Sequence, residues 1–251
     1  MDTGYHLGFA WLENLTNSLA AEAWKQFLAI QEAGGMYQMV FDGKVQEAMA
    51  ANLKARLADV AKRKEVLLGS NQFPNFTEVA RKKIKKTEAK ACGCNGTCEH
   101  SLPTLPIARA AEEFEALRLE TEAAKKQPVA FMLTIGNLAM RIARAQFSCN
   151  FLACAGYKVI DNNGFATIAE GIKAARKAKA DIIVLCSSDD EYADLAPKAW
   201  KKLQGKKELF IVAGAPACME DLQKLGIQNF IHVRSNVLET LKSYNQQLLK
   251  K

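Results

Sequence analysis

The chain has 251 residues, of which 49% are apolar and 24% are charged, a balance that is ordinary for a globular protein of one or two domains. No apolar stretch approaches the ~20 residues that cross a bilayer, and the N-terminus lacks the basic and apolar regions of a secretory signal. A membrane-spanning or secreted protein is therefore not expected, and we predict a cytoplasmic one.

The net charge is +7, and much of the basic excess lies in one run at residues 81–86. A nucleic-acid surface would combine such a run with exposed aromatic side chains or a known binding module, and neither is evident. A solvated linker or helix face is favoured over a phosphate-contacting patch. We expect neither nucleic acid nor a membrane as a partner.

Residues 1–73 are predicted to be mainly helical, because apolar side chains recur there every three or four residues. Thr16 is the predicted N-cap of the first helix, and glycine-containing pairs at 34–35 and 42–43 separate it from two later helices. The short apolar run at residues 66–69 predicts a buried strand.

Residues 74–127 are predicted to be a linker that ends in a helix from about residue 107 to residue 125. Within the linker, a C-x-C-x3-C-x-H arrangement has the three thiols and one imidazole that a tetrahedral zinc shell needs. The spacing differs from the C-x2-C pairs of common zinc fingers, so an unliganded or redox-sensitive loop is the favoured alternative. The candidate metal ligands are Cys92, Cys94, Cys98 and His100.

Five apolar runs alternate with five helical patterns over residues 128–251, which predicts an α/β domain with a flavodoxin-like, five-stranded parallel sheet. Ligands of such sheets lie beyond the carboxyl ends of the strands. Gly136, Ser187 and Gly214 stand in loops at that edge, where tight turns also need such residues for structural reasons. The predicted strands are 129–134, 157–160, 181–186, 209–213 and 230–233, and the predicted helices are 138–155, 168–179, 192–203, 217–225 and 237–249.

Three stretches of the chain carry one resemblance. They are Glu13-Asn14-Leu15-Thr16 with Val66-Leu67-Leu68-Gly69-Ser70-Asn71, then Arg109-Ala110-Ala111-Glu112-Glu113-Phe114, and finally Phe151-Leu152-Ala153-Cys154-Ala155-Gly156-Tyr157. Together they resemble the methylmalonyl-CoA mutase family. The resemblance implies that residues 1–73 correspond to the end of the family's substrate-binding (β/α)8 barrel, or TIM barrel, and residues 128–251 to its cobalamin-binding domain.

Catalytic members of this family carry Asp-x-His-x-x-Gly at the start of the first helix of the cofactor domain, and the histidine is the lower axial ligand of cobalt. The corresponding positions here are Ala139, Arg141 and Arg144, and no histidine stands between His100 and His232. An arginine side chain has no lone pair to offer a metal. We therefore expect this chain to bind no cobalamin and to supply no catalytic residue. The loop positions 136, 187 and 214 would then be remnants of a cofactor site that no longer binds.

The family's non-catalytic small subunit shows a different pattern at the same helix, and this chain matches it at Arg144, Phe147, Asn150, Ala153 and Gly156. The resemblance implies a heterodimer with a large catalytic subunit, which would hold adenosylcobalamin and interconvert methylmalonyl-CoA and succinyl-CoA. The chain would then be the C-terminal part of a small subunit, or a shortened relative. The alternative is a stand-alone ligand-binding or metal-responsive regulatory module that has lost cobalamin binding.

Overall fold

The computed structural model describes residues 5–82, 105 and 108–249, and the chain divides into two compact units. One unit holds residues 1–55 and 89–107, and the other holds residues 56–88 and 108–251. The described residues 5–55 of the first unit form helices, as predicted, namely α1 (Tyr5–Glu32), α2 (Gly35–Phe41) and most of α3 (Lys44–Ala61). Among the described residues, no helix combines the length and the apolar character that crossing a membrane demands.

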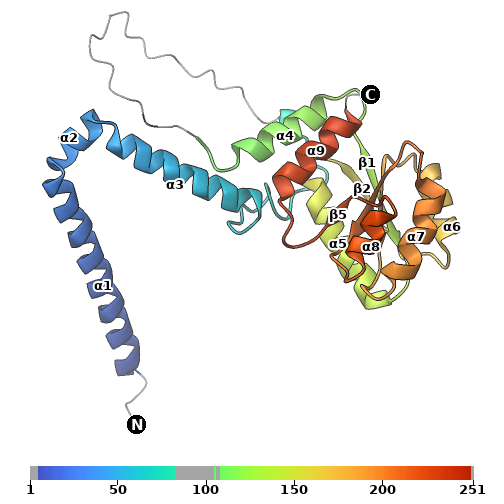
Figure 1. Ribbon diagram of the computed structural model, residues 1–251, viewed down its shortest axis with the longest axis horizontal. Coiled ribbons are helices and arrows are strands. Elements are labelled where there is room, and N and C mark those ends of the chain that lie inside the picture. Colours follow the sequence, from blue (N-terminus) through green and yellow to red (C-terminus); the bar gives the residue numbers. More distant parts are fainter. Residues whose placement is uncertain (1–4, 83–104, 106–107, 250–251) are drawn as a thin grey trace, which may run out of the picture. The chain divides into compact units, whose positions relative to one another are not determined.

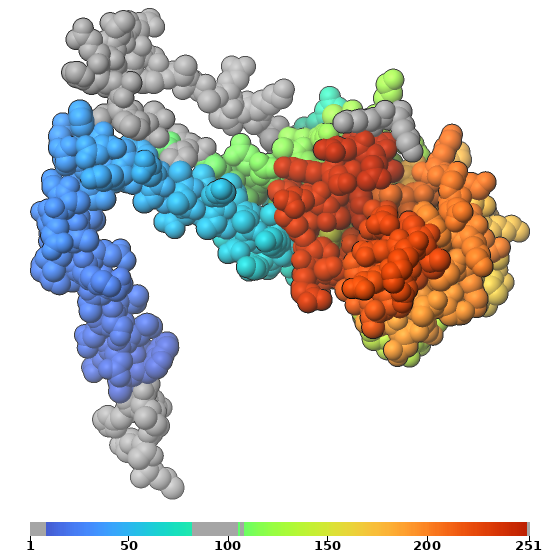
Figure 2. All heavy atoms as spheres, in the orientation of Figure 1, coloured from blue at the N-terminus to red at the C-terminus, as the bar shows by residue number. Residues whose placement is uncertain are grey.

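The helices of the first unit, drawn in blue in Figure 2, leave many apolar side chains exposed to solvent by their accessible area. Trp24 and Phe27 stack at 5.2 Å between ring centroids, yet they are 62% and 47% exposed. The predicted N-cap at Thr16 is wrong, because α1 begins at Tyr5 and continues through this position. The Thr16 hydroxyl donates to the Leu12 carbonyl one turn earlier, as a threonine inside a helix does.

The second unit is built on a five-stranded sheet in which every pair of neighbouring strands is parallel, in the order β2-β1-β3-β4-β5 (Figure 1). This arrangement confirms the predicted α/β fold. The central strands β1 and β3 are almost wholly buried because helices cover both faces, which explains their continuous apolar sequences. The strands are β1 (Val129–Thr134), β2 (Lys158–Ile160), β3 (Ile182–Cys186), β4 (Leu209–Ala213) and β5 (Phe230–Ile231).

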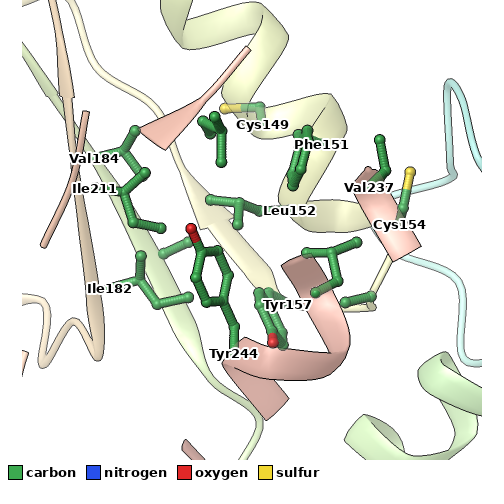
Figure 3. Packing of buried hydrophobic residues seen from close by; sticks show 14 of the residues in the cluster. Cys149, Phe151, Leu152, Cys154, Tyr157, Ile182, Val184, Ile211, Val237 and Tyr244 are labelled. Carbon is green, nitrogen blue, oxygen red and sulfur yellow. The ribbon is translucent and has the colours of Figure 1, made fainter. Parts of the chain in front are cut away.

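Two separate apolar clusters fill the faces of the sheet. One face packs against α4 (Glu112–Ala123), α5 (Leu138–Ala153) and α9 (Val237–Leu248). Figure 3 shows this cluster, in which Leu152 of α5 and Tyr244 of α9 approach the side chains of β3 and β4. The other face packs against α6 (Ile168–Lys177), α7 (Tyr192–Leu203) and α8 (Met219–Lys224).

Residues 56–82, which end in the short 3-10 helix η1 (Ala80–Lys82), belong to the same compact unit as the sheet. The predicted buried strand at residues 66–69 is wrong. Asn71 is fully buried, its amide accepts from Leu67 N and donates to Val60 O, and these bonds fold the segment into a turn. Leu68 makes one isolated bridge and is 78% exposed.

Helix α4 is joined to the sheet domain by buried polar side chains. Arg118 is 8% exposed, and it donates to the carbonyls of Asn75 and Glu78 as well as to Glu122. A second network centres on Asn245 of α9, which is 1% exposed. Its oxygen accepts from Tyr157 Oη at 2.7 Å, while its nitrogen donates to groups of α4.

Candidate functional site

The turn between β1 and α5 carries a glycine, and any larger residue at this position would push the Glu191 side chain away. Gly136 has a φ of +79°, and a Cβ built on it would lie 2.2 Å from Glu191 Oε2. The Glu191 carboxylate accepts from the Asn137 N–H at 3.1 Å, from the Ser188 hydroxyl at 2.7 Å, and from the Ser187 hydroxyl. It therefore closes the turn at the edge where open α/β sheets bind ligands.

The second turn at this edge is closed by Arg141. Its guanidinium donates to the Gly136 carbonyl at 3.2 Å and to the Asn163 carbonyl at 3.0 Å. A Cβ on Gly164 would lie 2.7 Å from Arg141 Cζ, so the side chain rests directly on that glycine. Arg141 thus links the loop after β1 to the loop after β2.

The third turn, after β4, is covered in the same manner. Arg144 donates to both carboxylate oxygens of Asp189, at 2.9 and 3.0 Å. A Cβ on Gly214 would lie 3.1 Å from Asp189 Oδ1 and 3.3 Å from Arg144 Cζ. The ion pair joins α5 to the loop after β3, and both partners face the glycine that follows β4.

Two further polar side chains brace these loops. Tyr192 is fully buried, and its hydroxyl donates to the Ala213 carbonyl at 2.5 Å and accepts from Ser187 N at 3.0 Å. Asn162 accepts from the Thr134 hydroxyl and donates to the Met132 carbonyl. The sequence did not single out these two residues or Glu191, because the bonds to Ala213, Met132 and Asn137 join groups that are distant along the chain.

The structure brings together the predicted positions Gly136, Arg141, Arg144, Ser187 and Gly214, whereas Ala139 stands exposed on the first turn of α5. His232 lies elsewhere, at the end of β5, where its Nδ1 accepts from Arg234 N at 3.2 Å. Burial, followed by the nearby Arg234, lowers the pKa of His232. The proposed metal ligands Cys92, Cys94, Cys98 and His100 lie outside the described residues.

These residues do not fit a corrin cofactor. The position expected to ligate cobalt holds a guanidinium, which has no lone pair for a metal. The three glycines at this edge, Gly136, Gly164 and Gly214, are covered by Glu191, Arg141 and the Arg144–Asp189 pair. Charged side chains of the chain itself fill the crevice at the carboxyl ends of the strands.

The Glu191 carboxylate gives this crevice a pH dependence that can be measured. Hydrogen bonds from Ser187 and Ser188 lower the pKa of Glu191 to about 2. Because this folded-state pKa lies below the unfolded value of about 4.3, the carboxylate stabilises the fold above pH ~4.5, and this stability is lost as the pH falls toward 2. We expect Glu191→Gln to destabilise the chain by roughly 1–3 kcal/mol at pH 7 and by about half as much at pH 3, where a carboxylate with a pKa of about 2 is still mostly ionised in the folded state.

Urea unfolding at the two pH values measures this difference. Asp190→Asn is the matched control, since Asp190 is an exposed neighbouring acid, and it should change stability little at either pH. An equal loss at pH 7 and pH 3 for Glu191→Gln would contradict the role of the ionised carboxylate.

Comparisons with known proteins agree with the family that the sequence resembles. A family model described as methylmalonyl-CoA mutase matches residues 7–144. The methylmalonyl-CoA mutase small subunit of Porphyromonas gingivalis is 56% identical over 240 residues, which are 96% of this chain and 38% of that protein. The small subunit of Streptomyces virginiae is 29% identical over 202 residues, 78% of this chain and 31% of that protein.

A third relative, the methylmalonyl-CoA mutase small subunit of Propionibacterium freudenreichii, is 28% identical over 241 residues, 94% of this chain and 36% of that protein. The chain therefore spans less than two fifths of the length of each of these relatives. Since the family model covers more than half of its residues, the chain belongs to the methylmalonyl-CoA mutase family.

Proposed function

We propose that this chain is the C-terminal part of a non-catalytic small subunit of methylmalonyl-CoA mutase. It would support a large subunit that holds adenosylcobalamin and interconverts methylmalonyl-CoA and succinyl-CoA. The relatives named as small subunits align with 78% to 96% of the chain, and they supply the subunit type.

The observation that carries the proposal is the filled crevice. A catalytic subunit must leave the carboxyl edge of this domain open and must present a metal ligand there. Here the terminal nitrogens of Arg141 donate to two backbone carbonyls and those of Arg144 are paired with Asp189, while Nε of each arginine is buried without a partner among the described residues. The chain retains the sheet and the helices of a cofactor domain but uses the edge to hold its own loops together.

The first test is a titration of the purified chain with cobalamin. We expect no change in the visible spectrum of the corrin and no rise in the melting temperature of the protein, because a ligand that binds only the folded state must stabilise it. A Kd in the micromolar range together with a changed corrin spectrum would contradict the proposal.

The second test is co-purification with the large mutase subunit, followed by an assay of the isomerisation with and without this chain. We expect the two chains to elute together, and we expect activity to require the large subunit. The large subunit alone and this chain alone, each with added adenosylcobalamin, are the controls. Turnover by this chain alone would contradict the proposal that it is a non-catalytic subunit.

A further inference from the structure

A cavity of about 800 Å³ lies along the outer side of α5, between this helix, the segment 62–76 and the ends of β2 and β5. Its volume is within the range of small-molecule sites, roughly 300–1,000 Å³. Neither Arg141, Arg144 nor Glu191 lines it, so it is distinct from the filled crevice. Because all of its lining residues belong to one compact unit, it is a feature of that unit alone.

Three phenylalanines, Phe73, Phe76 and Phe147, line this cavity. Phe73 has a φ of +49°, a left-handed conformation that a bulky residue adopts at a cost, and yet its side chain is 62% exposed. A hydrogen bond of 3.0 Å from Phe73 N to Asn150 Oδ1 holds the backbone there. The fold thus keeps an aromatic ring at the solvent boundary of a cavity in a conformation that folding alone does not favour.

One part of the cavity is cationic. Lys62 and Arg63 line it, and neither forms an ion pair with an acidic side chain in the described part of the chain. The Arg63 guanidinium lies 5.2 Å from the ring centroid of Phe151 and donates to Cys154 Sγ. Its Nε, like those of Arg141 and Arg144, is buried and has no hydrogen-bond partner among the described residues.

The same cavity carries groups that can hydrogen-bond to a polar ring. Asp161 is the one acidic residue in its lining, and His232 also contributes to the wall. The Nδ1 atom of His232 accepts a hydrogen bond from the Arg234 N–H, which holds the imidazole in place. Burial favours the neutral imidazole by lowering the pKa of His232, so the two basic residues Lys62 and Arg63 outnumber the one acid, Asp161, in the lining.

We propose that this cavity binds a nucleoside diphosphate, with the base stacked on the exposed phenylalanine rings and the phosphates next to Lys62 and Arg63, and ADP serves as the probe. A nucleic-acid base of any kind can stack on a phenylalanine ring. A phosphate supplies the negative charge that would balance Lys62 and Arg63, and it can accept hydrogen bonds from the exposed Lys62 ammonium. This inference does not depend on the proposed subunit function, because no residue of the filled crevice takes part.

Isothermal titration of the 251-residue chain with ADP tests the proposal. Adenosine carries only the ring and pyrophosphate carries only the charge, so they serve as the two half-ligands. We expect ADP to bind with a Kd below 1 mM and each half-ligand to bind at least tenfold more weakly, since a base–aromatic stack and a charged contact both contribute. The absence of ADP binding, or pyrophosphate binding as tight as that of ADP, would overturn the proposal.

Two variants locate the site. Phe73→Gly removes the ring, and glycine suits the left-handed backbone there, so the variant should keep or raise the melting temperature while weakening ADP binding about tenfold. Lys62→Glu reverses an exposed charge and should weaken ADP binding by a similar factor. Lys201→Glu, on α7 at the other face of the sheet, is the matched charge control and should leave binding unchanged. Unchanged ADP affinity in both Phe73→Gly and Lys62→Glu would place the nucleotide elsewhere.

Discussion

Gly136→Ala should destabilise the chain by about 2–4 kcal/mol in urea unfolding at pH 7. An L-residue at a φ of +79° carries a strain of roughly 1–2 kcal/mol. The new Cβ would also lie 2.2 Å from Glu191 Oε2, so the carboxylate must move away and give up hydrogen bonds from Asn137, Ser187 and Ser188. The loss of these bonds accounts for the remainder of the expected effect.

Two controls separate the strain from the displaced carboxylate. Gly205→Ala has a similar φ of +72° with no atom within 4 Å of the new Cβ, so it should show only the strain. In a Glu191→Ala background, Gly136→Ala should likewise cost only about 1–2 kcal/mol, because the carboxylate is already absent. Additive effects of the two substitutions would contradict the contact between Glu191 and the turn.

Asn245→Ala should destabilise the chain by roughly 2–4 kcal/mol, measured by urea unfolding of the full chain. The substitution leaves the buried hydroxyl of Tyr157 without the acceptor that lies at 2.7 Å, and it leaves a small void beneath α4. It also removes donors to Glu120 Oε2 and Thr121 Oγ1, which join α9 to α4. Helix α4 should therefore loosen first.

Hydrogen exchange at α4 provides the local measurement. We expect faster exchange at Leu117 and Thr121 in Asn245→Ala than at the β3 amides, since the broken bonds lie at α4. Tyr157→Phe in the Asn245→Ala background should recover about 1 kcal/mol or more, because the orphaned hydroxyl is then gone. Equal acceleration in all elements, or no recovery by the second substitution, would contradict a local role for Asn245.

The sheet domain was predictable because its strands are continuous apolar runs between turn residues. β1 and β4 have the predicted bounds, and α7 spans the predicted residues 192–203. β5 stops at Ile231, two residues before the predicted end, since the N–H of His232 donates to Ser235 Oγ. The run at residues 66–69 has a strand-like composition, but Asn71 bonds to its backbone from a buried position that local sequence cannot indicate.

The candidate site was predictable in part. The sequence places Arg141 and Arg144 at the start of α5, and the chemistry of a guanidinium is enough to predict that neither ligates a metal. Their partners could not be predicted. Asp189 and Glu191 lie after β3, 45 and 54 positions away from the groups they contact on α5 and in the β1 turn, so only the folded sheet brings them together.

The three covered glycines have a consequence for how this chain matures. Proteins whose loops are ordered by a small molecule gain stability only when that molecule is supplied. Here the equivalent loops are tied by groups that are already part of the polypeptide, namely Glu191, Arg141 and the Arg144–Asp189 pair. A newly synthesised chain can therefore close these loops with its own side chains as soon as the sheet has formed.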